Sequence, residues 1–267
     1  MNSQQGQSAN SDPVAIVTGG GTGIGAACAS VLASNGCRVI VNYRSSEQQA
    51  KAVVEECQDK GAEAIAVQGD IASDQDCRRV IDSAIEKWGA VDFLVNNAGT
   101  TRFVDADNFD ALNKEDFDQV MSVNVSGAYQ MTRAATPYLR QSDSASVVNV
   151  SSHSGFSGIG SSIAYAASKG ALNTLTLSLA RALAPDIRVN AVCPGFVDTH
   201  WMKKKALSDA EIAAFKTKVA SIAPLKKIPS SEEVANTVAW FLLHAKSITG
   251  QLLVIDGGTH LTVGDPL

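Results

Sequence analysis

The 267-residue sequence predicts an α/β fold, with one doubly wound domain built on a seven-stranded parallel sheet that carries helices on both faces. Two observations support this prediction. Short apolar, β-branched segments alternate with longer helical segments along almost the whole chain, and a glycine-rich turn follows the first apolar segment. No Pro/Gly/Ser-rich linker and no internal repeat divides the chain, which favours a single domain over residues 13–267.

Seven segments have the length and the apolar content expected of buried parallel strands. These strand segments are Val14–Thr18, Arg38–Asn42, Ala64–Gln68, Phe93–Asn96, Ser146–Val150, Arg188–Cys193 and Leu252–Ile255. The helical segments between them are Ile24–Asn35, Glu47–Lys60, Asp74–Trp88, Lys114–Gln141, Ile163–Ala182 and Glu232–Leu243. A glycine follows each of the first two helical segments and is expected to end it.

Two parts of the chain depart from this alternation. Residues 1–12 are rich in Gln, Ser and Asn and lack the basic start and apolar stretch of a secretory signal, so we expect a flexible tail. Residues 196–231, after the sixth predicted strand, show no clear periodicity. We expect this segment to form small helices that close over a pocket as a lid.

Composition and charge exclude several classes of function. The net charge of −5 and the pI of about 5.4 argue against nucleic acid or an anionic membrane as the main partner. No apolar run reaches the roughly 18 residues of a membrane span. The five scattered cysteines favour reduced thiols in a cytoplasmic protein, and the four histidines lack ligand spacing, so no metal site is expected.

The glycine-rich turn joins the first predicted strand to the first predicted helix and runs from Thr18 to Gly25. Glycines let the backbone turn tightly and let a pyrophosphate approach the main-chain N–H groups at a helix N-terminus. The spacing G-x-x-x-G-x-G is a variant of the dinucleotide-binding fingerprint of Rossmann folds. Taken alone, the turn is also compatible with a strand–helix connection that binds no ligand.

Later segments, together with this turn, resemble those of the short-chain dehydrogenase/reductase family. The matching segments are Asn96-Asn97-Ala98-Gly99, Asn124 within VNVSG, Ser152 with Tyr165-Ala-Ala-Ser-Lys169, Pro194-Gly195-Phe196-Val197-Asp198-Thr199, Ile248-Thr249-Gly250-Gln251 and Asp256-Gly257-Gly258. They follow the order in which the family places them, and this makes the set far more specific than any single motif. Within the family, the sequence is most similar to 3-oxoacyl-carrier-protein reductases and to glucose or other polyol dehydrogenases.

The resemblance implies an enzyme that transfers hydride between a nicotinamide cofactor and a carbonyl or secondary-alcohol carbon. Tyr165 would protonate the carbonyl oxygen in reduction and act as the base in oxidation. Ser152 would hold the substrate oxygen by a hydrogen bond. Lys169 would bind the nicotinamide ribose and lower the Tyr165 pKa, while Asn124 would support a water-mediated proton path to Lys169.

The spacing of Tyr165 and Lys169 agrees with these roles. The two residues are four apart on a predicted helix, so their side chains share one face. An ammonium about 4 Å from a phenol supplies up to roughly 4 kcal/mol at an effective dielectric of about 20, enough to lower the phenol pKa by two to three units. The alternative is an amphipathic helix whose Tyr and Lys lie at the surface, and the matching glycine turn, Asn124 and Ser152 argue against it.

The resemblance also implies a cofactor site built from the loops that follow the strands. Tyr165 and Lys169 would contribute to it. The residues at the phosphates would be Gly19, Thr22, Gly23, Ile24 and Gly25, and those at the adenine Asp70 and Ile71. Asn97, Ala98 and Gly99 would lie beside the adenosine ribose, and Pro194, Gly195, Val197 and Thr199 beside the nicotinamide. Asp70 is also a candidate helix N-cap, although Ser73 and Asp74 are better placed for that role.

The end of the second predicted strand favours NADP(H). Sites specific for NAD place an acid there to bind the ribose 2′-hydroxyl, whereas an arginine accommodates a 2′-phosphate. Here Arg44 and Ser45 occupy this position, and the first acid is Glu47. Thr22 stands where many NADP-using relatives carry a second basic residue, which leaves NAD(H) use open, and Arg44 is also compatible with a solvated surface arginine.

The substrate side is less defined by the sequence. Candidate pocket walls are the aromatic, aliphatic and thioether side chains near the catalytic motifs, namely His153, Phe156, Ile159, Phe196, His200, Trp201 and Met202. This composition suits a moderately apolar ketone or acyl chain, and a 3-oxoacyl substrate is the leading expectation, with a sugar or polyol as the alternative. A non-catalytic cofactor-binding protein is a further alternative, opposed by the presence of Tyr165 and Lys169. By resemblance, a homotetramer is expected.

Overall fold

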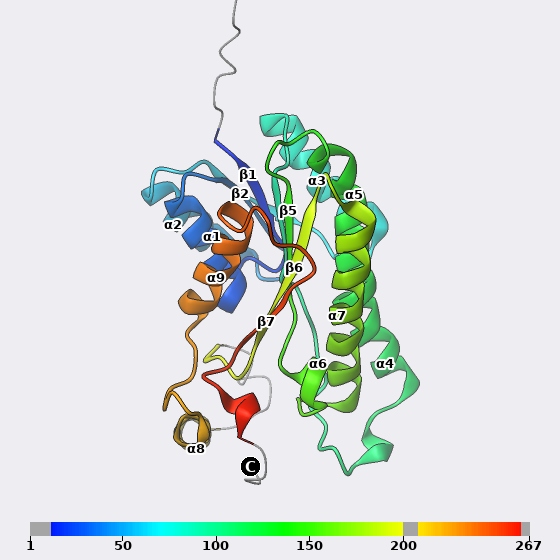
Figure 1. Ribbon diagram of the computed structural model, residues 1–267, viewed down its shortest axis with the longest axis vertical. Coiled ribbons are helices and arrows are strands. Elements are labelled where there is room, and N and C mark those ends of the chain that lie inside the picture. Colours follow the sequence, from blue (N-terminus) through cyan, green and yellow to red (C-terminus); the bar gives the residue numbers. More distant parts are fainter. Residues whose placement is uncertain (1–11, 200–207, 263–267) are drawn as a thin grey trace, which may run out of the picture.

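The computed structural model describes residues 12–199 and 208–262, which fold around a seven-stranded parallel sheet (Figure 1). The strand order is β3-β2-β1-β4-β5-β6-β7, and all neighbouring strands pair in parallel. The predicted α/β class is therefore confirmed. The strands are β1 (Val14–Val17), β2 (Arg38–Tyr43), β3 (Ala64–Gln68), β4 (Phe93–Asn96), β5 (Ser146–Val150), β6 (Arg188–Pro194) and β7 (Leu252–Ile255).

Nine α-helices lie within the described ranges, and six of them form the two outer layers of the fold. The helices are α1 (Gly23–Ser34), α2 (Glu47–Asp59), α3 (Asp74–Trp88), α4 (Lys114–Met121), α5 (Ala128–Leu139), α6 (Ser154–Ser157), α7 (Ile163–Leu183), α8 (Asp209–Ile222) and α9 (Ser231–Leu243). Figure 1 shows α1, α2 and α9 on one face of the sheet and α3, α5 and α7 on the other. Within the described ranges, none of the helices is both long enough and apolar enough to cross a membrane.

Each face of the sheet has its own apolar core, because successive side chains of a strand point to opposite faces. In β1, Ala15 and Val17 pack with α1, α2 and α9, whereas Val14 and Ile16 pack with α3, α5 and α7. All four side chains are fully buried. The continuous apolar runs of the central strands follow from this double burial.

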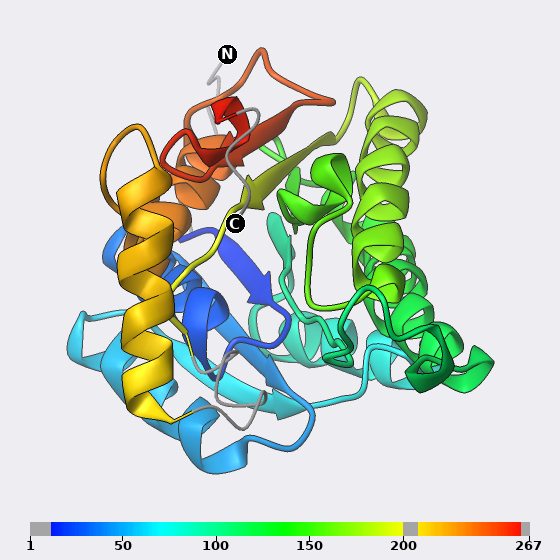
Figure 2. The same cartoon turned by 90° about the horizontal axis from the view of Figure 1, so that it is seen from below.

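The chain changes direction between β1 and β4, and this position determines where a ligand can bind. From β1 the chain proceeds outward through β2 and β3, then returns to place β4 on the other side of β1. The loops after β1 and β4 therefore diverge and leave a crevice at the carboxyl ends of the strands. Figure 2 views this end of the sheet, with α8 on one side and α6 and α7 on the other.

The segment predicted as one helix over Lys114–Gln141 is different in the structure. It consists of α4, a π-helical stretch over Ser122–Gly127, and α5, which ends at Leu139. The wider turn carries Asn124, whose side-chain amide binds both backbone groups of Thr100. Such π-turns are frequent at functional positions, and this one depends on a contact between distant parts of the chain.

Among its described residues, the segment after β6 contains the helix α8, which is longer than the small helices that were expected. The helix α8 spans 14 residues and begins with a capping box, in which Ser208 and Glu211 satisfy each other's backbone N–H groups. Its buried residues, Ile212 and Val219, are one face of an amphipathic pattern. Residues 200–207, in the same segment, lie outside the described ranges.

Arg188, the first residue of β6, ties the sheet to the end of α9. Its guanidinium donates hydrogen bonds to the carbonyls of Phe241, Leu242 and Ala245 at 2.6, 2.8 and 2.9 Å. The last carbonyls of a helix have no partner within the helix, so a partly buried guanidinium that reaches two of them, and a third carbonyl just beyond the helix, acts as a C-terminal cap.

We predict that Arg188→Met destabilises the protein by about 1–3 kcal/mol, because it leaves these half-buried carbonyls without their donor. Urea unfolding followed by circular dichroism measures the change in free energy. Arg181→Met, at an exposed arginine of α7 with no ion pair among the described residues, is the matched control and should change it by less than about 0.5 kcal/mol. Equal effects of the two substitutions would contradict the capping role.

Candidate active site

A cleft of about 910 Å³ lies at the carboxyl ends of the strands, over the crevice between β1 and β4. The loops after β1, β2, β3, β4, β5 and β6 all contribute to its lining, as do α7 and α8. Nearly all residues expected to bind the cofactor line it, namely Gly19, Thr22, Gly23, Ile24, Arg44, Ser45, Asp70, Ile71, Asn97, Ala98, Gly99, Tyr165, Lys169, Pro194, Gly195, Val197 and Thr199. Gly25 is buried behind the loop instead.

The conformation of the glycine loop requires glycine at two positions. Gly19 has a φ of +60°, in the left-handed region, and a Cβ there would lie 2.9 Å from the Cα of Ala98. A Cβ on Gly25 would lie 2.3 Å from the carbonyl oxygen of Gly19 and 2.4 Å from Nδ2 of Asn97. Gly25 therefore permits close packing of the start of α1 against the loop, which explains why it does not face the cleft.

Hydrogen bonds from Thr18 and Asn97 join the glycine loop to the turn after β4. Thr18 Oγ1 accepts hydrogen bonds from the backbone N–H groups of Asn97 and Ala98, both at 3.0 Å. The Asn97 side-chain amide donates to the carbonyls of Thr18 and Gly19 at 2.9 and 3.1 Å. The Asn97 side chain thus braces the loop, and Asn97 is also part of the cleft lining. Its place beside the adenosine ribose stays a prediction.

The start of α1 has the properties of a phosphate site. Thr22 occupies the N-cap position in an extended conformation, its side chain makes no capping hydrogen bond, and the first turn contains no acidic residue. The N-terminal N–H groups of a helix lack intrahelical partners and carry partial positive charge. Because Thr22, Gly23 and Ile24 line the cleft, these groups fit the pyrophosphate of a dinucleotide.

The far end of the cleft carries Arg44 and Asp70. The Arg44 guanidinium lies 3.8 Å from the Asp70 carboxylate, with side-chain exposures of 58% and 38%, so the pair is a solvent-screened ion pair. Asp70 also accepts a hydrogen bond from the backbone N–H of Ala72 at 3.0 Å. Ser73, rather than Asp70, is the N-cap of α3, since its side chain accepts from the Asp76 N–H.

Ser152 and Tyr165 meet at the other end of the cleft. Ser152 follows β5, and its hydroxyl also contacts Ser154, whose backbone N–H donates to Ser152 Oγ at 3.1 Å. Tyr165 lies in the first turn of α7, where the N-cap Ser162 accepts from its backbone N–H. A hydrogen bond links the Ser152 and Tyr165 side chains. These are the two groups expected to contact a substrate oxygen.

Lys169 lies one turn further along α7, as its spacing from Tyr165 predicts. It is 4% exposed, its Nζ donates to the carbonyl of Val150 at 2.8 Å, and the same atom lies 5.6 Å from the Tyr165 ring centroid. Burial lowers the pKa of Lys169 to about 8. The amine is therefore still mostly protonated at neutral pH, and it faces the cleft.

The pKa of Tyr165 departs from the sequence-based expectation. Burial raises the pKa of Tyr165 to about 12, and the hydrogen bond from Ser152 opposes this only in part. The net shift is therefore opposite to the expected lowering, because burial is the largest effect on the phenol and the Lys169 amine donates its hydrogen bond to the Val150 carbonyl. At neutral pH the phenol is protonated and suited to donate a proton.

Asn124 supports the site from behind and does not line the cleft. Its Oδ1 accepts from the Thr100 N–H at 2.7 Å, and its Nδ2 donates to the Thr100 carbonyl at 3.0 Å and to Ser168 Oγ at 2.9 Å. Ser168 Oγ in turn donates to the carbonyl of Tyr165 at 2.7 Å. Asn124 therefore connects the loop after β4 to α7. Its predicted part in a proton path stays a prediction.

The residues expected to bind substrate fall into three groups. His153, Ile159 and Phe196 line the cleft, and burial lowers the pKa of His153. Phe156, which was expected as a wall, is 52% exposed and is not part of the lining, because the short helix α6 turns it outward. His200, Trp201 and Met202 lie outside the described residues.

Sequence reasoning missed several residues that shape the cleft. Phe103 and Val104 come from the loop after β4, and Phe215, Val219 and Ile222 come from α8. The α8 residues follow a helical period that was visible in the sequence. The loop residues carry no local signal, because only the folded chain brings them to the cleft.

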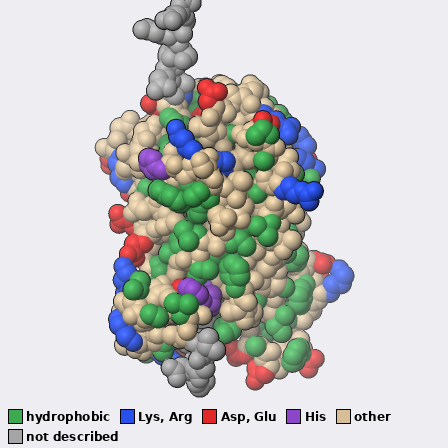
Figure 3. Space-filling model, in the orientation of Figure 1, with side chains coloured by type: hydrophobic (Ala, Val, Ile, Leu, Met, Phe, Trp, Pro, Cys, Tyr) green, Lys and Arg blue, Asp and Glu red, His purple; other side chains and the backbone are tan. Residues whose placement is uncertain are grey.

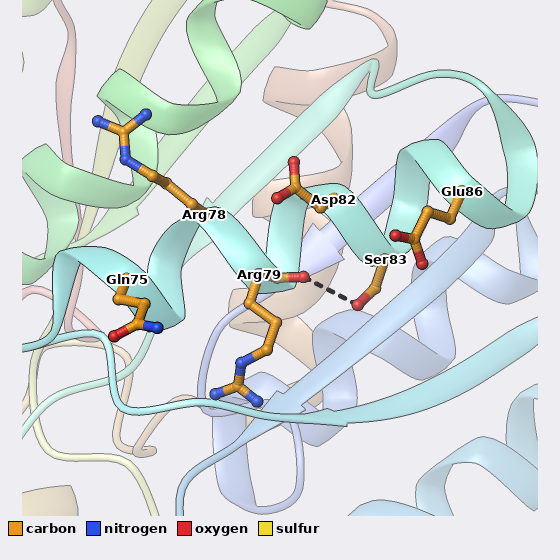
Figure 4. Close-up of a pocket in the computed structure, with 6 residues that line it drawn as sticks. All are labelled: Gln75, Arg78, Arg79, Asp82, Ser83 and Glu86. Carbon is orange, nitrogen blue, oxygen red and sulfur yellow. Dashed lines mark hydrogen bonds between the residues drawn. The ribbon is translucent and has the colours of Figure 1, made fainter.

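A second, smaller hollow of about 340 Å³ lies on the surface of α3 and is lined by Gln75, Arg78, Arg79, Asp82, Ser83 and Glu86 (Figure 4). Figure 4 shows these side chains spread along one helix, and the one hydrogen bond drawn joins Ser83 to the carbonyl of Arg79. We find no catalytic arrangement there. Within the described ranges, no group of three His, Cys, Asp or Glu side chains could hold a metal ion.

Comparisons with known proteins agree with this geometry. Residues 13–210 match the family model for short chain dehydrogenases. Over 249 residues, the chain is 39% identical to a Streptomyces violaceoruber protein named as ketoacyl reductase 2 of the granaticin polyketide synthase, covering 93% of this chain and 96% of that protein. It is 36% identical to the 3-oxoacyl-[acyl-carrier-protein] reductase of Staphylococcus aureus, covering 92% and 98%.

A solved structure agrees as well. A crystal structure from Burkholderia xenovorans, named as a short-chain dehydrogenase/reductase, superimposes with a TM-score of 0.87 at 44% identity and covers 94% of this chain and 99% of that one. The fold, the family model and these relatives all lead to the same assignment. The chain belongs to the short-chain dehydrogenase family and is an oxidoreductase of the nicotinamide-dependent type.

Proposed function

We propose that the chain reduces the keto group of a 3-oxoacyl-type substrate, with Tyr165 as the acid and NADP(H) as the preferred cofactor. The observation that carries the proposal is the arrangement of Ser152, Tyr165 and Lys169 at one end of a cleft whose other end fits a dinucleotide. A bound reduced nicotinamide supplies the hydride. The names of the relatives, a ketoacyl reductase and a 3-oxoacyl reductase, support the substrate class.

The proposed proton transfer uses groups that are already in contact. Ser152 holds the substrate oxygen through its hydroxyl, and Tyr165 gives its phenolic proton to the same oxygen as negative charge develops there. The raised pKa of Tyr165 keeps this proton in place at neutral pH, which favours the direction of reduction. The phenolate that remains is stabilised by the Ser152 hydroxyl and by the Lys169 ammonium.

The preference for NADP(H) rests on the end of β2. Arg44 and Ser45 line the cleft there, and no acid stands at the end of this strand to bind a 2′-hydroxyl. Arg44 is half exposed, so it can turn from Asp70 toward a phosphate without losing a strong interaction. Because Asp70 remains beside it, the proposal is a preference and includes use of NAD(H).

We also propose that the chain forms a homotetramer. Apolar side chains are exposed on α7, at Leu177 (47%), on α9, at Trp240 (43%), and on β7, at Leu253 (41%). Figure 3 shows that hydrophobic side chains are spread over the middle of the face that carries these elements, with charged side chains mainly toward its edges. Such patches are typical of protein–protein contacts.

Tyr165→Phe is expected to reduce kcat for ketone reduction by about 10²- to 10⁴-fold, because it removes the proton donor but keeps the ring. NADPH oxidation followed by absorbance measures the rate, and fluorescence titration should show NADPH binding within about twofold of the wild type. Tyr129→Phe, on the exposed side of α5, is the control and should keep full activity. Activity retained in the Tyr165 variant would refute the assigned acid.

Arg44→Ala is expected to weaken NADPH binding by about tenfold to a hundredfold, since a hydrogen bond to a charged group is worth about 1.5–3 kcal/mol. NADH lacks the 2′-phosphate, so its affinity should change by less than about twofold. Isothermal titration with both cofactors measures the two constants. An equal loss of affinity for NADPH and NADH would show that Arg44 does not bind the 2′-phosphate.

Light scattering coupled to size exclusion is expected to give a mass of about four chains. Leu177→Lys places a charge in the exposed apolar patch of α7 and should lower the mass to that of a dimer or monomer. Thr174→Lys, at an exposed residue of the same helix, controls for added charge. A single-chain mass for the wild type would refute the assembly.

A further inference from the structure

We propose that Asn173, through its hydrogen bond with Ser151, is a positioning residue that holds Ser152 and Lys169 in place relative to each other. Asn173 lies on α7, one turn beyond Lys169, and Ser151 lies between the last residue of β5 and Ser152. The inference rests on the proposed function, because it concerns two residues of the proposed reaction. Asn173 does not line the cleft, so it acts through residues that do.

The hydroxyl of Ser151 joins the end of β5 to α7. Its Oγ donates to Oδ1 of Asn173 at 2.6 Å and lies 3.3 Å from the backbone carbonyl oxygen of Lys169. A hydroxyl has one proton to donate, so the shorter contact with Asn173 is the stronger of the two. The three residues are each 4% or 5% exposed, and a hydrogen bond in such a buried place is stronger than one in water.

This bond fixes the position of both neighbours of Ser151 along the chain. On one side, the carbonyl of Val150 accepts the hydrogen bond from Lys169 Nζ at 2.8 Å. On the other side, Ser152 supplies the hydroxyl that is hydrogen bonded to Tyr165. A shift of Ser151 relative to α7 would therefore displace the acceptor of the Lys169 amine and the partner of the Tyr165 phenol together.

The same asparagine side chain also lies under α6, which packs beside α7 (Figure 1). A Cβ on Gly155 would lie 2.7 Å from Nδ2 of Asn173 and 2.8 Å from the carbonyl oxygen of Lys169, so the backbone of α6 approaches these atoms as closely as a glycine allows. The preceding residue, Ser154, donates its backbone N–H to Ser152 Oγ. Asn173 thus contacts the chain on both sides of Ser152.

The hydrogen bonding of Asn173 favours a role in function over a role in stability alone. Among the described residues, its Nδ2 is buried and has no hydrogen-bond partner. An unpaired buried donor destabilises the folded state, so a side chain without this amide would remove that cost. Residues that lower stability in this way are typical of functional sites, where activity limits the choice of side chain.

The test measures the reduction of methyl 3-oxobutanoate by NADPH, with each rate divided by the number of NADPH-binding sites counted by fluorescence titration. Asn173→Ala and Ser151→Ala should each lower kcat by about 10-fold to 100-fold, because a small displacement of reacting groups is costly. The Kd for NADPH should change by less than about threefold. Ser151→Thr keeps the hydroxyl and should retain most of kcat. The double variant should lose no more than the more affected single variant, because both substitutions remove the same bond.

Thr176→Ala is the matched control, because Thr176 is buried on α7 and its Oγ1 accepts from Nδ2 of Asn149, on β5, at 2.8 Å. It breaks another buried bond between the same strand and helix, so it should lower the Tm at least as much as Asn173→Ala does. It should leave kcat per NADPH site within about twofold of the wild type.

Equal losses of kcat in Asn173→Ala and Thr176→Ala, or an unchanged kcat in Ser151→Ala, would overturn the inference and leave the proposed reduction intact. Ser151→Ala removes a single oxygen atom and decides the question if Asn173→Ala does not fold. Absence of wild-type turnover with this ester and with its longer homologues would instead overturn the proposed function, and this inference with it.

Discussion

The hydrogen bonds between Thr18 and the turn after β4 are the constraint on which the rest of the site depends. They fix the loops that leave β1 and β4, the two strands between which the chain changes direction. Because Asn97 also binds the carbonyls of Thr18 and Gly19, the glycine loop is held by the turn after β4, while Gly19, Thr22 and Gly23 still line the cleft. A Cβ on Gly25 would intrude into this junction, so the glycine spacing follows from packing as much as from phosphate binding.

A second set of contacts positions the catalytic end. Asn124 joins the loop after β4 to Ser168, and Ser168 binds the carbonyl of Tyr165. The same loop therefore contacts both the glycine turn, through Asn97, and α7, through Asn124. Both ends of the cleft are therefore hydrogen bonded to one loop. The π-helical stretch between α4 and α5 is the part of the chain that carries Asn124 and makes these contacts.

The sequence was sufficient for the fold class and for most of the cleft, because both depend on local patterns and short motifs. The strand boundaries agree within about one residue, as expected for continuous apolar runs between glycines. What it did not predict depends on contacts between distant residues: the π-helical stretch at Asn124, the bracing role of Asn97 and the contribution of Phe215 to the cleft lining. The direction of the Tyr165 pKa shift was also not predictable. The spacing on the helix predicts that Lys169 is near Tyr165, but it does not predict the burial of the phenol or the hydrogen bond between Lys169 and the Val150 carbonyl.

The opposite pKa shifts of Tyr165 and Lys169 are compatible with proton donation at neutral pH. Burial disfavours the charged form of each group, so it raises the phenol to about 12 and lowers the amine to about 8. Near pH 7 both groups therefore hold their protons. In the proposed reaction Tyr165 gives its proton to the substrate oxygen, and a phenolate would then lie beside an ammonium in the same poorly solvated site, where opposite charges attract more strongly than in water. Burial disfavours the charged form of either group alone, but it strengthens the attraction between phenolate and ammonium that the proposed proton transfer would create. For this reaction, the buried position of Lys169 is therefore as important as its spacing from Tyr165.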